Sequence, residues 1–276
     1  MIRNYIKVAV RNLMRHKFIS GINLFGLTVG ITCCLLILSY ILHELSYDRY
    51  HKNADNIYRV GRTFIHPESG EVSLDLGSIA PPAGPLLQND FKEIKKMTRV
   101  LSNGLTAFRY GDKRFNERNA FFADEHFPEF FDLEMTKGNP RTALADPYSV
   151  VLSETIAQKY FGSEDPMNKV VRLDNQLDMK VTGVYKSFPS NSHMHPEMLI
   201  SFNTLRDTAV YGEEQLRTNW GNNSFFTYLM LPDNFDPQKL EAQFPAFLDR
   251  HLNDGGSMKA SKGTRLTLRK LADIHL

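Results

Sequence analysis

The sequence predicts an α+β protein in which one N-terminal transmembrane helix precedes a mixed α/β, two-lobed domain outside the membrane. Three observations lead to this prediction. Residues 18–42 contain no Asp, Glu, Lys or Arg. The preceding residues, 1–17, carry five basic side chains and no acidic one. Beyond residue 56, short strand-like runs of β-branched and aromatic residues are interspersed with a few helical patterns, as in an α+β domain.

The uncharged stretch is best explained as a retained transmembrane helix at residues 18–43. A helix of 25 residues is about 37 Å long, which spans a hydrocarbon core of about 30 Å with some tilt. A signal peptide has a shorter apolar core, of about 7–15 residues, and then a small-residue cleavage site. The residues that follow here, HELSYDRYHK, offer no such site, and Ile31 and Thr32 fit a lipoprotein signal before Cys33 poorly.

The segment before the span, residues 1–17, is predicted to be a cytoplasmic, basic, amphipathic helix. Its cations are Arg3, Lys7, Arg11, Arg15 and Lys17. By the positive-inside rule they place the N-terminus in the cytoplasm and the domain that follows outside. The apolar residues recur at three- or four-residue steps on another face, so the helix is expected to lie in the inner headgroup layer with its cations near lipid phosphates. The alternative is a basic flank that only fixes topology; nucleic-acid binding is not expected beside a span.

Two features inside the span concern packing. Gly26 and Gly30 form a G-x-x-x-G pattern, which lets a second helix approach closely, and they are predicted to be helix-packing residues. Cys33 and Cys34 are the only cysteines and are expected to be structural. The outer domain therefore has no disulfide framework and must be stabilised by an apolar core.

The first half of the outer domain begins with a polar turn or helical extension at residues 46–56. Strand patterns follow at 57–65, 71–77, 97–101, 105–110 and 114–123. Gly111 and Asp112 predict a hairpin turn between the last two. A pair of prolines favours a helix start in the stretch 80–91, and the Phe-rich run 126–135 predicts a short core helix before a loop at 138–147.

The second half predicts strands at 149–153, 169–175, 178–188, 224–231 and 264–271, with a strand or helix start at 198–205. A helix is predicted between Ser153 as its N-cap and Gly162 at its end. A second is predicted at 236–252, with a kink at Pro245. Loops are expected at 188–197 and 254–263.

No sequence motif for catalysis is found. The patterns G-x-x-x-x-G-K-[ST], H-E-x-x-H and G-x-S-x-G do not occur, so the chain is not predicted to be an enzyme or to bind a cofactor. His193, His195 and Glu197 alternate and could face one metal ion from a strand. They lie in a polar loop bounded by prolines, with no second cluster, so no metal site is predicted.

Two other candidates have structural explanations. Asp124, Glu125 and His126 could suggest acid–base chemistry, but adjacent residues on a helix diverge, and an exposed cap is favoured. Trp220, the only tryptophan, could line a ligand groove, although packing in the core is the preferred interpretation.

The residue patterns resemble one known family along essentially the whole chain. IKVAVRNLMRHKFISGINLFGLTVGI resembles the N-terminal segment of MacB/FtsX-type ABC transporter permeases. ELSYDRYHKNADNIYRV resembles the entry to their periplasmic core domain, and SVVLSETIAQKYFGSEDPMNKVVRL and VTGVYKSFPSNSHMHPEMLIS resemble its middle. WGNNSFFTYLML and LRKLADIHL are similar to its later part. On this resemblance, residues 44–276 are expected to be a MacB-like periplasmic core domain.

The resemblance implies a function as well as a fold. In the family, one transmembrane helix precedes the periplasmic domain and three follow it, two permeases pair, and a cytoplasmic ABC ATPase drives them. The chain is thus expected to be a permease subunit in the bacterial inner membrane that couples ATP hydrolysis by a partner to periplasmic motion, for export or extraction of a substrate. Met167 and Asn168 replace a common Ile-Gly, and the chain ends where a second span is expected, which suggests a truncated permease.

Two other functions are considered beside this one. A single-span sensor would bind a ligand outside and signal inward, but residues 1–17 are too few for an output domain. A membrane-anchored enzyme would need a catalytic constellation, which the sequence does not offer.

Overall fold

The computed structural model describes residues 2–252 and 258–275. It divides into two compact units, Met1–Tyr47 and Asp48–Leu276. Of the predicted loop at 254–263, residues 254–257 lie outside the described residues.

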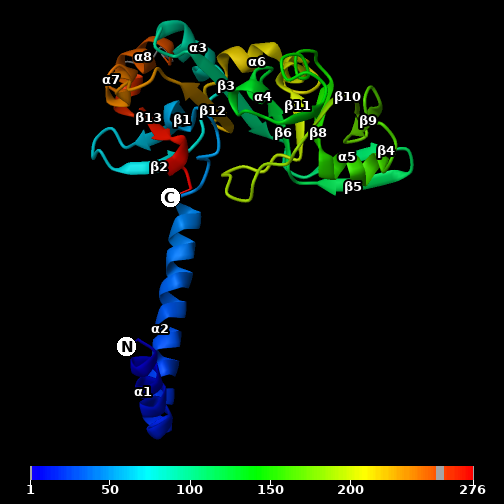
Figure 1. Cartoon of the computed structure of the whole chain (residues 1–276). Coiled ribbons are helices and arrows are strands. Elements are labelled where there is room, and N and C mark those ends of the chain that lie inside the picture. Colours follow the sequence, from blue (N-terminus) through cyan, green and yellow to red (C-terminus); the bar gives the residue numbers. More distant parts are fainter. Residues whose placement is uncertain (1, 253–257, 276) are drawn as a thin grey trace. The chain divides into compact units, whose positions relative to one another are not determined.

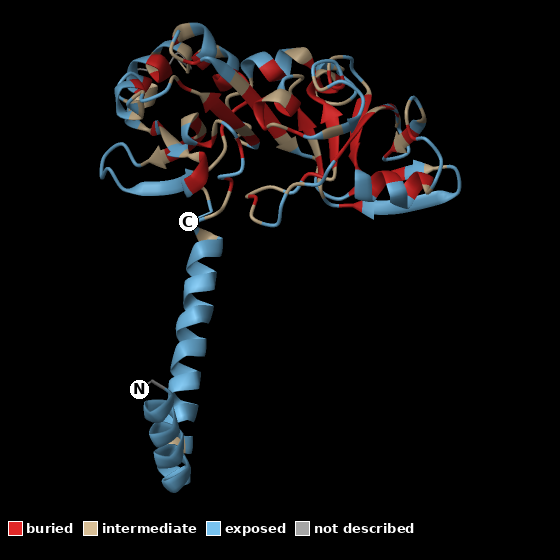
Figure 2. Cartoon of the chain, in the orientation of Figure 1, coloured by how far each residue is buried: buried red, intermediate tan, exposed pale blue. Residues whose placement is uncertain are grey.

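The first unit consists of two helices, α1 (Ile2–Arg15) and α2 (Lys17–Glu44). They are separated at His16, whose backbone leaves the helical region with φ −115° and ψ 50°. No residue of α2 is buried, and almost all of this helix is pale blue, the colour of exposed residues, in Figure 2. Among the described residues, α2 is the one helix long and apolar enough to cross a membrane.

The second unit is built on one mixed sheet of 13 strands, in agreement with the predicted α+β class. Its strands are β1 (Ile57–Ile65), β2 (Val72–Leu76), β3 (Lys96–Ser102), β4 (Thr106–Tyr110), β5 (Lys113–Glu117), β6 (Ala120–Ala123), β7 (Met135–Lys137), β8 (Ser149–Ser153), β9 (Val170–Leu173), β10 (Leu177–Tyr185), β11 (Met198–Ser201), β12 (Phe225–Met230) and β13 (Thr264–Lys270). The main order is β13-β1-β12-β3-β6-β11-β8-β10-β9-β4-β5, with β2 on β1 and β7 on β10. The pairs β8–β10 and β6–β11 are parallel.

Short helices cover this sheet, as Figure 1 shows. They are α3 (Ala83–Asp90), α4 (Phe127–Phe130), α5 (Glu154–Phe161), α6 (Glu213–Thr218), α7 (Pro237–Glu241) and α8 (Phe244–His251), with 3₁₀ turns at Ala54–Asn56, Phe202–Arg206, Ala260–Lys262 and Leu271–Asp273.

The apolar core has a separate cluster toward each end of the sheet, while the two lobes expected from the sequence stay a prediction, because residues 48–276 form one compact unit. One cluster packs α3, α7 and α8 against β1, β12 and β13. Another packs α5 against β4, β8, β9 and β10. A third, rich in aromatic rings, lies between them around α4. Because one sheet runs past all three clusters, its buried strands, red in Figure 2, form one continuous layer.

The strands at the start and the end of the domain are neighbours. β1 and β13 pair antiparallel from Tyr58 opposite Lys270 to Phe64 opposite Thr264. On its other side β1 pairs with β12. A displacement of either end of the domain chain therefore acts on adjacent strands of the same sheet.

Local signals predicted several elements correctly. The Ser153 hydroxyl accepts a hydrogen bond from the Ile156 N–H at 3.2 Å and caps α5, which ends at Gly162 with φ 62°. That left-handed conformation favours glycine. The predicted β4–β5 hairpin is present, with Tyr110 opposite Lys113 and Gly111 in the turn at φ 55°.

Several elements differ from the prediction, among them β7, which was not predicted, and α4, which is shorter than the helix expected at 126–135. The single strand expected at 114–123 is two, because β5 pairs with β4 whereas β6 pairs with β3 and β11. The helix expected at 236–252 is two helices rather than one kinked helix. Pro245 lies in the first turn of α8, where its missing N–H leaves no hydrogen bond unmade. α6 was not predicted, because only Leu216 of its six residues is buried.

Candidate functional site

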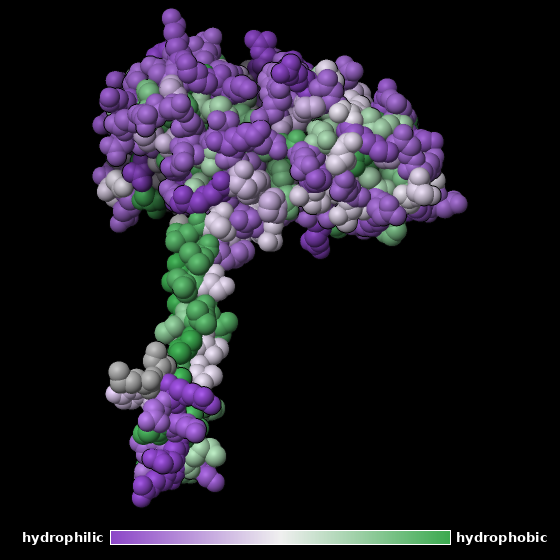
Figure 3. Space-filling view, viewed as in Figure 1, coloured by the Kyte–Doolittle hydropathy of each residue, from purple (hydrophilic) through white to green (hydrophobic). Residues whose placement is uncertain are grey.

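The cations predicted to contact lipid all belong to α1 or to the first residue of α2. Arg3, Lys7, Arg11 and Arg15 lie on α1, Lys17 begins α2, and all five are exposed. The larger apolar residues of α1, among them Tyr5 and Leu13, are exposed as well. Figure 3 shows these polar side chains in purple beside green apolar ones, next to a predominantly green α2. An amphipathic helix with no buried apolar face is suited to a lipid or protein surface.

The predicted packing residues lie on an open face of α2. A Cβ atom added at Gly26 or Gly30 would meet no atom within 4 Å. Among the described residues nothing lies against that face at these glycines, so the close approach that glycine permits is available to a helix of another chain. The role of the two glycines in packing stays a prediction.

The outer domain begins at a buried carboxylate, four residues after the end of α2. Asp48 is 0% exposed and has a left-handed backbone with φ 56°. Its N–H donates to the Asn191 carbonyl at 2.9 Å. Its carboxylate accepts hydrogen bonds from the Ser192 hydroxyl at 3.1 Å and from the His193 backbone N–H at 3.2 Å. The first residue of the domain is thus held by the loop between β10 and β11.

The imidazole of His193 extends this network into the sheet. Its Nδ1 lies 2.9 Å from Asp48 Oδ2, and its Nε2 lies 2.8 Å from the hydroxyl of Tyr228 on β12. A carboxylate only accepts hydrogen bonds, so the tautomer with its proton on Nδ1 is favoured beside Asp48, although the Nδ1–Oδ2 contact does not have the angle of a hydrogen bond. In the neutral imidazole, Nε2 then accepts from the Tyr228 O–H. Asp48, His193 and Tyr228 therefore connect the domain entrance to the middle of the sheet.

The charge state of Asp48 is set by these partners. Burial by itself would raise the pKa of Asp48, but hydrogen bonds and electrostatic attraction from His193, with the Ser192 hydroxyl, outweigh it and hold the pKa below its ordinary value. The Tyr50 hydroxyl donates to Ser192 Oγ at 3.0 Å, and burial raises the pKa of Tyr50. The carboxylate is therefore ionised, and the phenol is neutral, at neutral pH.

His51, three residues after Asp48, packs against aromatic rings of the outer domain. Its ring centroid lies 4.0 Å from that of Tyr50, 5.2 Å from that of Phe131 and 5.9 Å from that of Phe188. Burial lowers the pKa of His51, although Asp48 and Asp132 oppose the effect. Neither ring nitrogen has a hydrogen-bond partner among the described residues. His51 is thus a neutral ring that packs against aromatic neighbours.

We call residues 48–52 the entry segment. Besides the contacts of Asp48, Tyr50 and His51, the Lys52 N–H donates to Asp132 Oδ2 at 2.8 Å. Asp48, Tyr50, His51 and Lys52 therefore each bind or pack against distant parts of the domain. Sequence reasoning missed this segment, because its partners lie 80 to 145 residues away.

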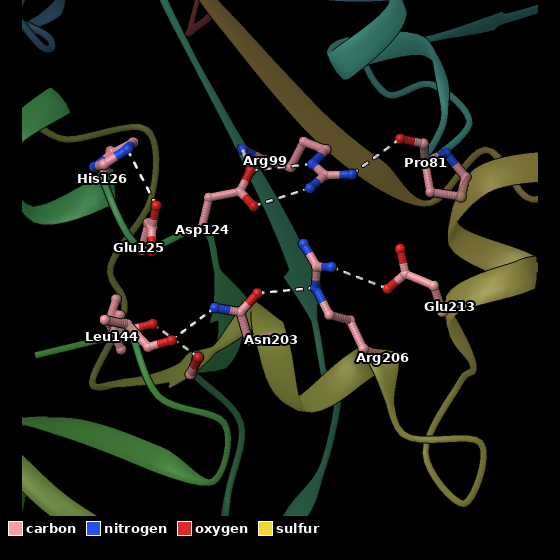
Figure 4. A network of polar contacts seen from close by, with 11 residues as sticks. Pro81, Arg99, Asp124, Glu125, His126, Leu144, Asn203, Arg206 and Glu213 are labelled. Carbon is pink, nitrogen blue, oxygen red and sulfur yellow. Dashed lines mark hydrogen bonds and ion pairs between the residues drawn. The ribbon is translucent and has the colours of Figure 1, made fainter. Parts of the chain in front are cut away.

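A polar cleft of about 780 Å³ lies beside α4 and the 3₁₀ turn that follows β11. Figure 4 shows that Asp124 points toward Arg99, with Arg99 Nε to Oδ2 and Nη2 to Oδ1 both at 3.0 Å. Arg99 also donates to the Pro81 carbonyl at 3.2 Å and lies 4.0 Å from the ring of Phe202. The interpretation of Asp124 as an exposed cap is wrong, because a guanidinium that is itself largely buried draws the carboxylate inward.

The remaining polar groups of the cleft bind each other. Arg206 donates to Asn203 Oδ1 at 3.0 Å and pairs with Glu213 at 3.1 Å, and Glu125 lies 3.2 Å from His126. Asp124 and His126 thus have different partners and do not converge on one reacting position. Ion pairs and hydrogen bonds between its own side chains, including the bond from the Tyr148 hydroxyl to Asp207, thus account for most polar groups of the cleft.

The histidines considered as metal ligands do not converge either. Asp48 and Tyr228 bind the two ring nitrogens of His193, and His195 is exposed. Among residues 2–252 and 258–275, no group of three or more His, Cys, Asp or Glu side chains could hold a metal ion. Both interpretations of Trp220 apply. Its ring centroid lies 6.4 Å from that of Phe247, and the residue also lines a cavity.

Comparison with known proteins agrees with this architecture. The model of the MacB-like periplasmic core domain family matches residues 20–247. The fold is similar to the crystal structure of a domain of a candidate permease protein from Porphyromonas gingivalis, with a TM-score of 0.67 and 22% identity over 80% of this chain and 91% of that chain. It is also similar to the periplasmic region of MacB from Actinobacillus actinomycetemcomitans, with a TM-score of 0.51 and 13% identity over 79% of this chain and 89% of that one. A comparison with curated proteins gave no match.

An apolar helix followed by this sheet-rich domain defines a membrane protein of the ABC transporter permease class, with its larger part periplasmic. The chain belongs to the MacB-like periplasmic core domain family. The family resemblance and the fold class predicted from the sequence are thereby confirmed.

Proposed function

We propose that the chain is a permease subunit of a MacB/FtsX-type ABC transporter in the bacterial inner membrane. A cytoplasmic ATPase binds and hydrolyses ATP, and the permease converts that cycle into motion of its periplasmic domain, which exports or extracts a substrate. The chain itself supplies no catalysis. Two permease copies pair, and lipid phosphates bind the cations of α1 and Lys17.

The entry segment is the observation that carries this proposal. Only residues 45–47 separate α2 from Asp48, whose carboxylate and N–H are bound inside the domain. Because His193 and Tyr228 continue the contact to β12, a displacement at Asp48 reaches the sheet through short bonds. Stiff helices and packed sheets transmit such displacements as rigid bodies.

The proposed orientation gives a labelling prediction. In a background with Cys33 and Cys34 replaced by alanine, a membrane-impermeant thiol reagent should label Glu68→Cys in intact spheroplasts but not Asn12→Cys. The physical reason is that the five cations before the span favour the cytoplasmic side. Both positions are exposed, so folding protects neither. Labelling of Asn12→Cys but not of Glu68→Cys would show that the orientation is opposite to the one proposed.

Transmission can be tested by spin-label distances in the assembled transporter. Two permease copies labelled at Glu68→Cys, in nanodiscs with the cognate ATPase, should show different inter-label distances with ATP and without nucleotide. When the catalytic glutamate of the ATPase is replaced, so that ATP binds without being hydrolysed, the inter-label distance should remain at its ATP-bound value. Identical distances in both nucleotide states would exclude the proposed motion.

An insertion between Tyr47 and Asp48 provides the matched control. A Gly-Gly-Ser insert leaves both units intact but makes their connection flexible. ATP hydrolysis should continue, whereas the nucleotide-dependent distance change should disappear. If the distance change survived the insertion, motion would have to reach the domain by another route than the entry segment.

A further inference from the structure

Arg62 is a buried cation with no carboxylate beside it. It lies on β1 and is 5% exposed. Its Nε donates to Thr264 Oγ1 at 3.1 Å, and its Nη1 donates to the Trp220 carbonyl at 2.9 Å and to Asn223 Oδ1 at 3.0 Å. All three acceptors are neutral. Within the described part of the chain, no Asp or Glu lies at ion-pair distance from Arg62.

The guanidinium retains unused donors. A guanidinium has five N–H groups, and the three bonds to Thr264, Trp220 and Asn223 leave both N–H groups of Nη2 without a hydrogen-bond acceptor among the described residues. Nη2 is not among the buried polar atoms that lack a partner, so it is open to solvent. A buried charge of this kind is stabilised when an anion supplies the missing acceptor.

Arg62 is one of the residues that line a cavity of about 500 Å³. Trp220, Leu252 and Met258 contribute apolar surface to it, and Lys259 contributes a second cation. A cavity of this size, with apolar walls and a few polar groups, has the usual character of a small-molecule site.

Among the described residues, the two carboxylates that contact residues lining this cavity already have partners. Asp90 pairs with His251 at 2.7 Å and with Arg250 at 2.8 Å. Asp249 accepts the Ser261 N–H at 2.9 Å and lies 4.0 Å from the Lys259 ammonium group. In the described part of the chain the Arg62 guanidinium therefore has neutral hydrogen-bond acceptors and the ring of Phe64 at 4.6 Å beside it but no carboxylate, so the cavity favours negative charge.

We propose that this cavity binds a small organic carboxylate. The carboxylate accepts hydrogen bonds from Nη2 of Arg62, and the apolar part of the ligand packs on Trp220, Leu252 and Met258. Lys259, at the rim, adds longer-range attraction. The proposal concerns a site within the outer domain and holds whether or not an ATPase moves that domain.

The single tryptophan makes the site directly observable. N-acetyl-leucine, which has a carboxylate and an apolar group, should change the fluorescence of Trp220 in the full chain in detergent with a saturable titration curve. N-acetyl-leucinamide has the same shape without the charge and should bind at least about tenfold more weakly. Inorganic phosphate should also bind more weakly, because it cannot use the apolar walls. Equal affinities for the acid and the amide would overturn the proposal.

Variants then assign the affinity to Arg62. Arg62→Met should lower the affinity for N-acetyl-leucine by at least about tenfold, and Lys259→Gln should lower it by a smaller factor. Arg265→Gln removes an exposed cation on β13 outside the cavity and should leave it unchanged. If Arg62→Met fails to fold, the comparison of acid and amide on the unmodified chain still decides. Unchanged affinity in a folded Arg62→Met variant would refute the site.

Discussion

Replacing Asp48 with alanine is expected to lower the free energy of unfolding of the outer domain by about 3–5 kcal/mol, because it leaves several buried hydrogen-bond donors unsatisfied at a cost of about 1–3 kcal/mol each. The substitution leaves the Ser192 hydroxyl and the His193 N–H without their acceptor in a buried position, and it removes the carboxylate oxygen that lies 2.9 Å from the imidazole Nδ1. Urea unfolding of the full chain in mild detergent, followed by Trp220 fluorescence, measures the loss.

The matched control is Asp178→Ala. Asp178 lies 3.6 Å from Arg172 in an exposed ion pair, so its removal should change stability little. If the two alanine variants unfolded at the same urea concentration, the network at the entry segment would contribute no more than a surface ion pair.

The shifted pKa of Asp48 also predicts that the stability of the outer domain depends on pH. Because the folded-state pKa of Asp48 lies below its ordinary value of about 3.9, its contribution is present above about pH 4 and is lost as the pH falls through the folded-state pKa. The stability difference between the original chain and Asp48→Asn should therefore be constant near neutral pH and should shrink in more acidic solution. A difference that grew on acidification would show that the carboxylate is not the stabilised form.

The structural features that could be predicted from the sequence are those determined by residues close together in the chain. The cap at Ser153, the end of α5 at Gly162 and the hairpin at Gly111 each depend on a few adjacent positions. The membrane helix was equally accessible, because length and absence of charge define it. Pro245 was recognised as a disruption, but whether a proline kinks a helix or starts a new one depends on packing around it.

The contacts of the entry segment, the polar cleft and the cavity beside Arg62 are each formed by residues far apart in the sequence. Asp48 and His193 are separated by 145 positions, and Arg62 and Thr264 by 202. Neither pair leaves a local pattern, since a lone Asp after a helix and a lone Arg in a strand are both common on surfaces. His193 was considered only as a metal ligand, because the sequence offered no sign of a carboxylate that would bind it.

The ion pair in the cleft gives the second large expected effect. Asp124→Leu should lower the free energy of unfolding by about 2–4 kcal/mol, less than a fully buried pair, because the Asp124 side chain keeps 18% of its exposure. The loss arises because Arg99 keeps its charge, with only the Pro81 carbonyl and the face of Phe202 beside it. Urea unfolding measures it, and Glu125→Gln, an exposed neighbour with only a surface contact to His126, is the control.

A double variant separates charge from packing in this result. Arg99→Met combined with Asp124→Leu removes both charges and retains apolar volume, so it should recover at least about half of the stability that Asp124→Leu loses. Recovery would mean that Asp124 is required mainly because Arg99 is there, and that the pair fixes the position of β3 against α3 and α4 rather than adding net stability. If the double variant were as unstable as Asp124→Leu, the loss would come from the hydrogen bond to the Arg99 backbone N–H at 2.7 Å and from local packing, and the unpaired-charge explanation would be wrong.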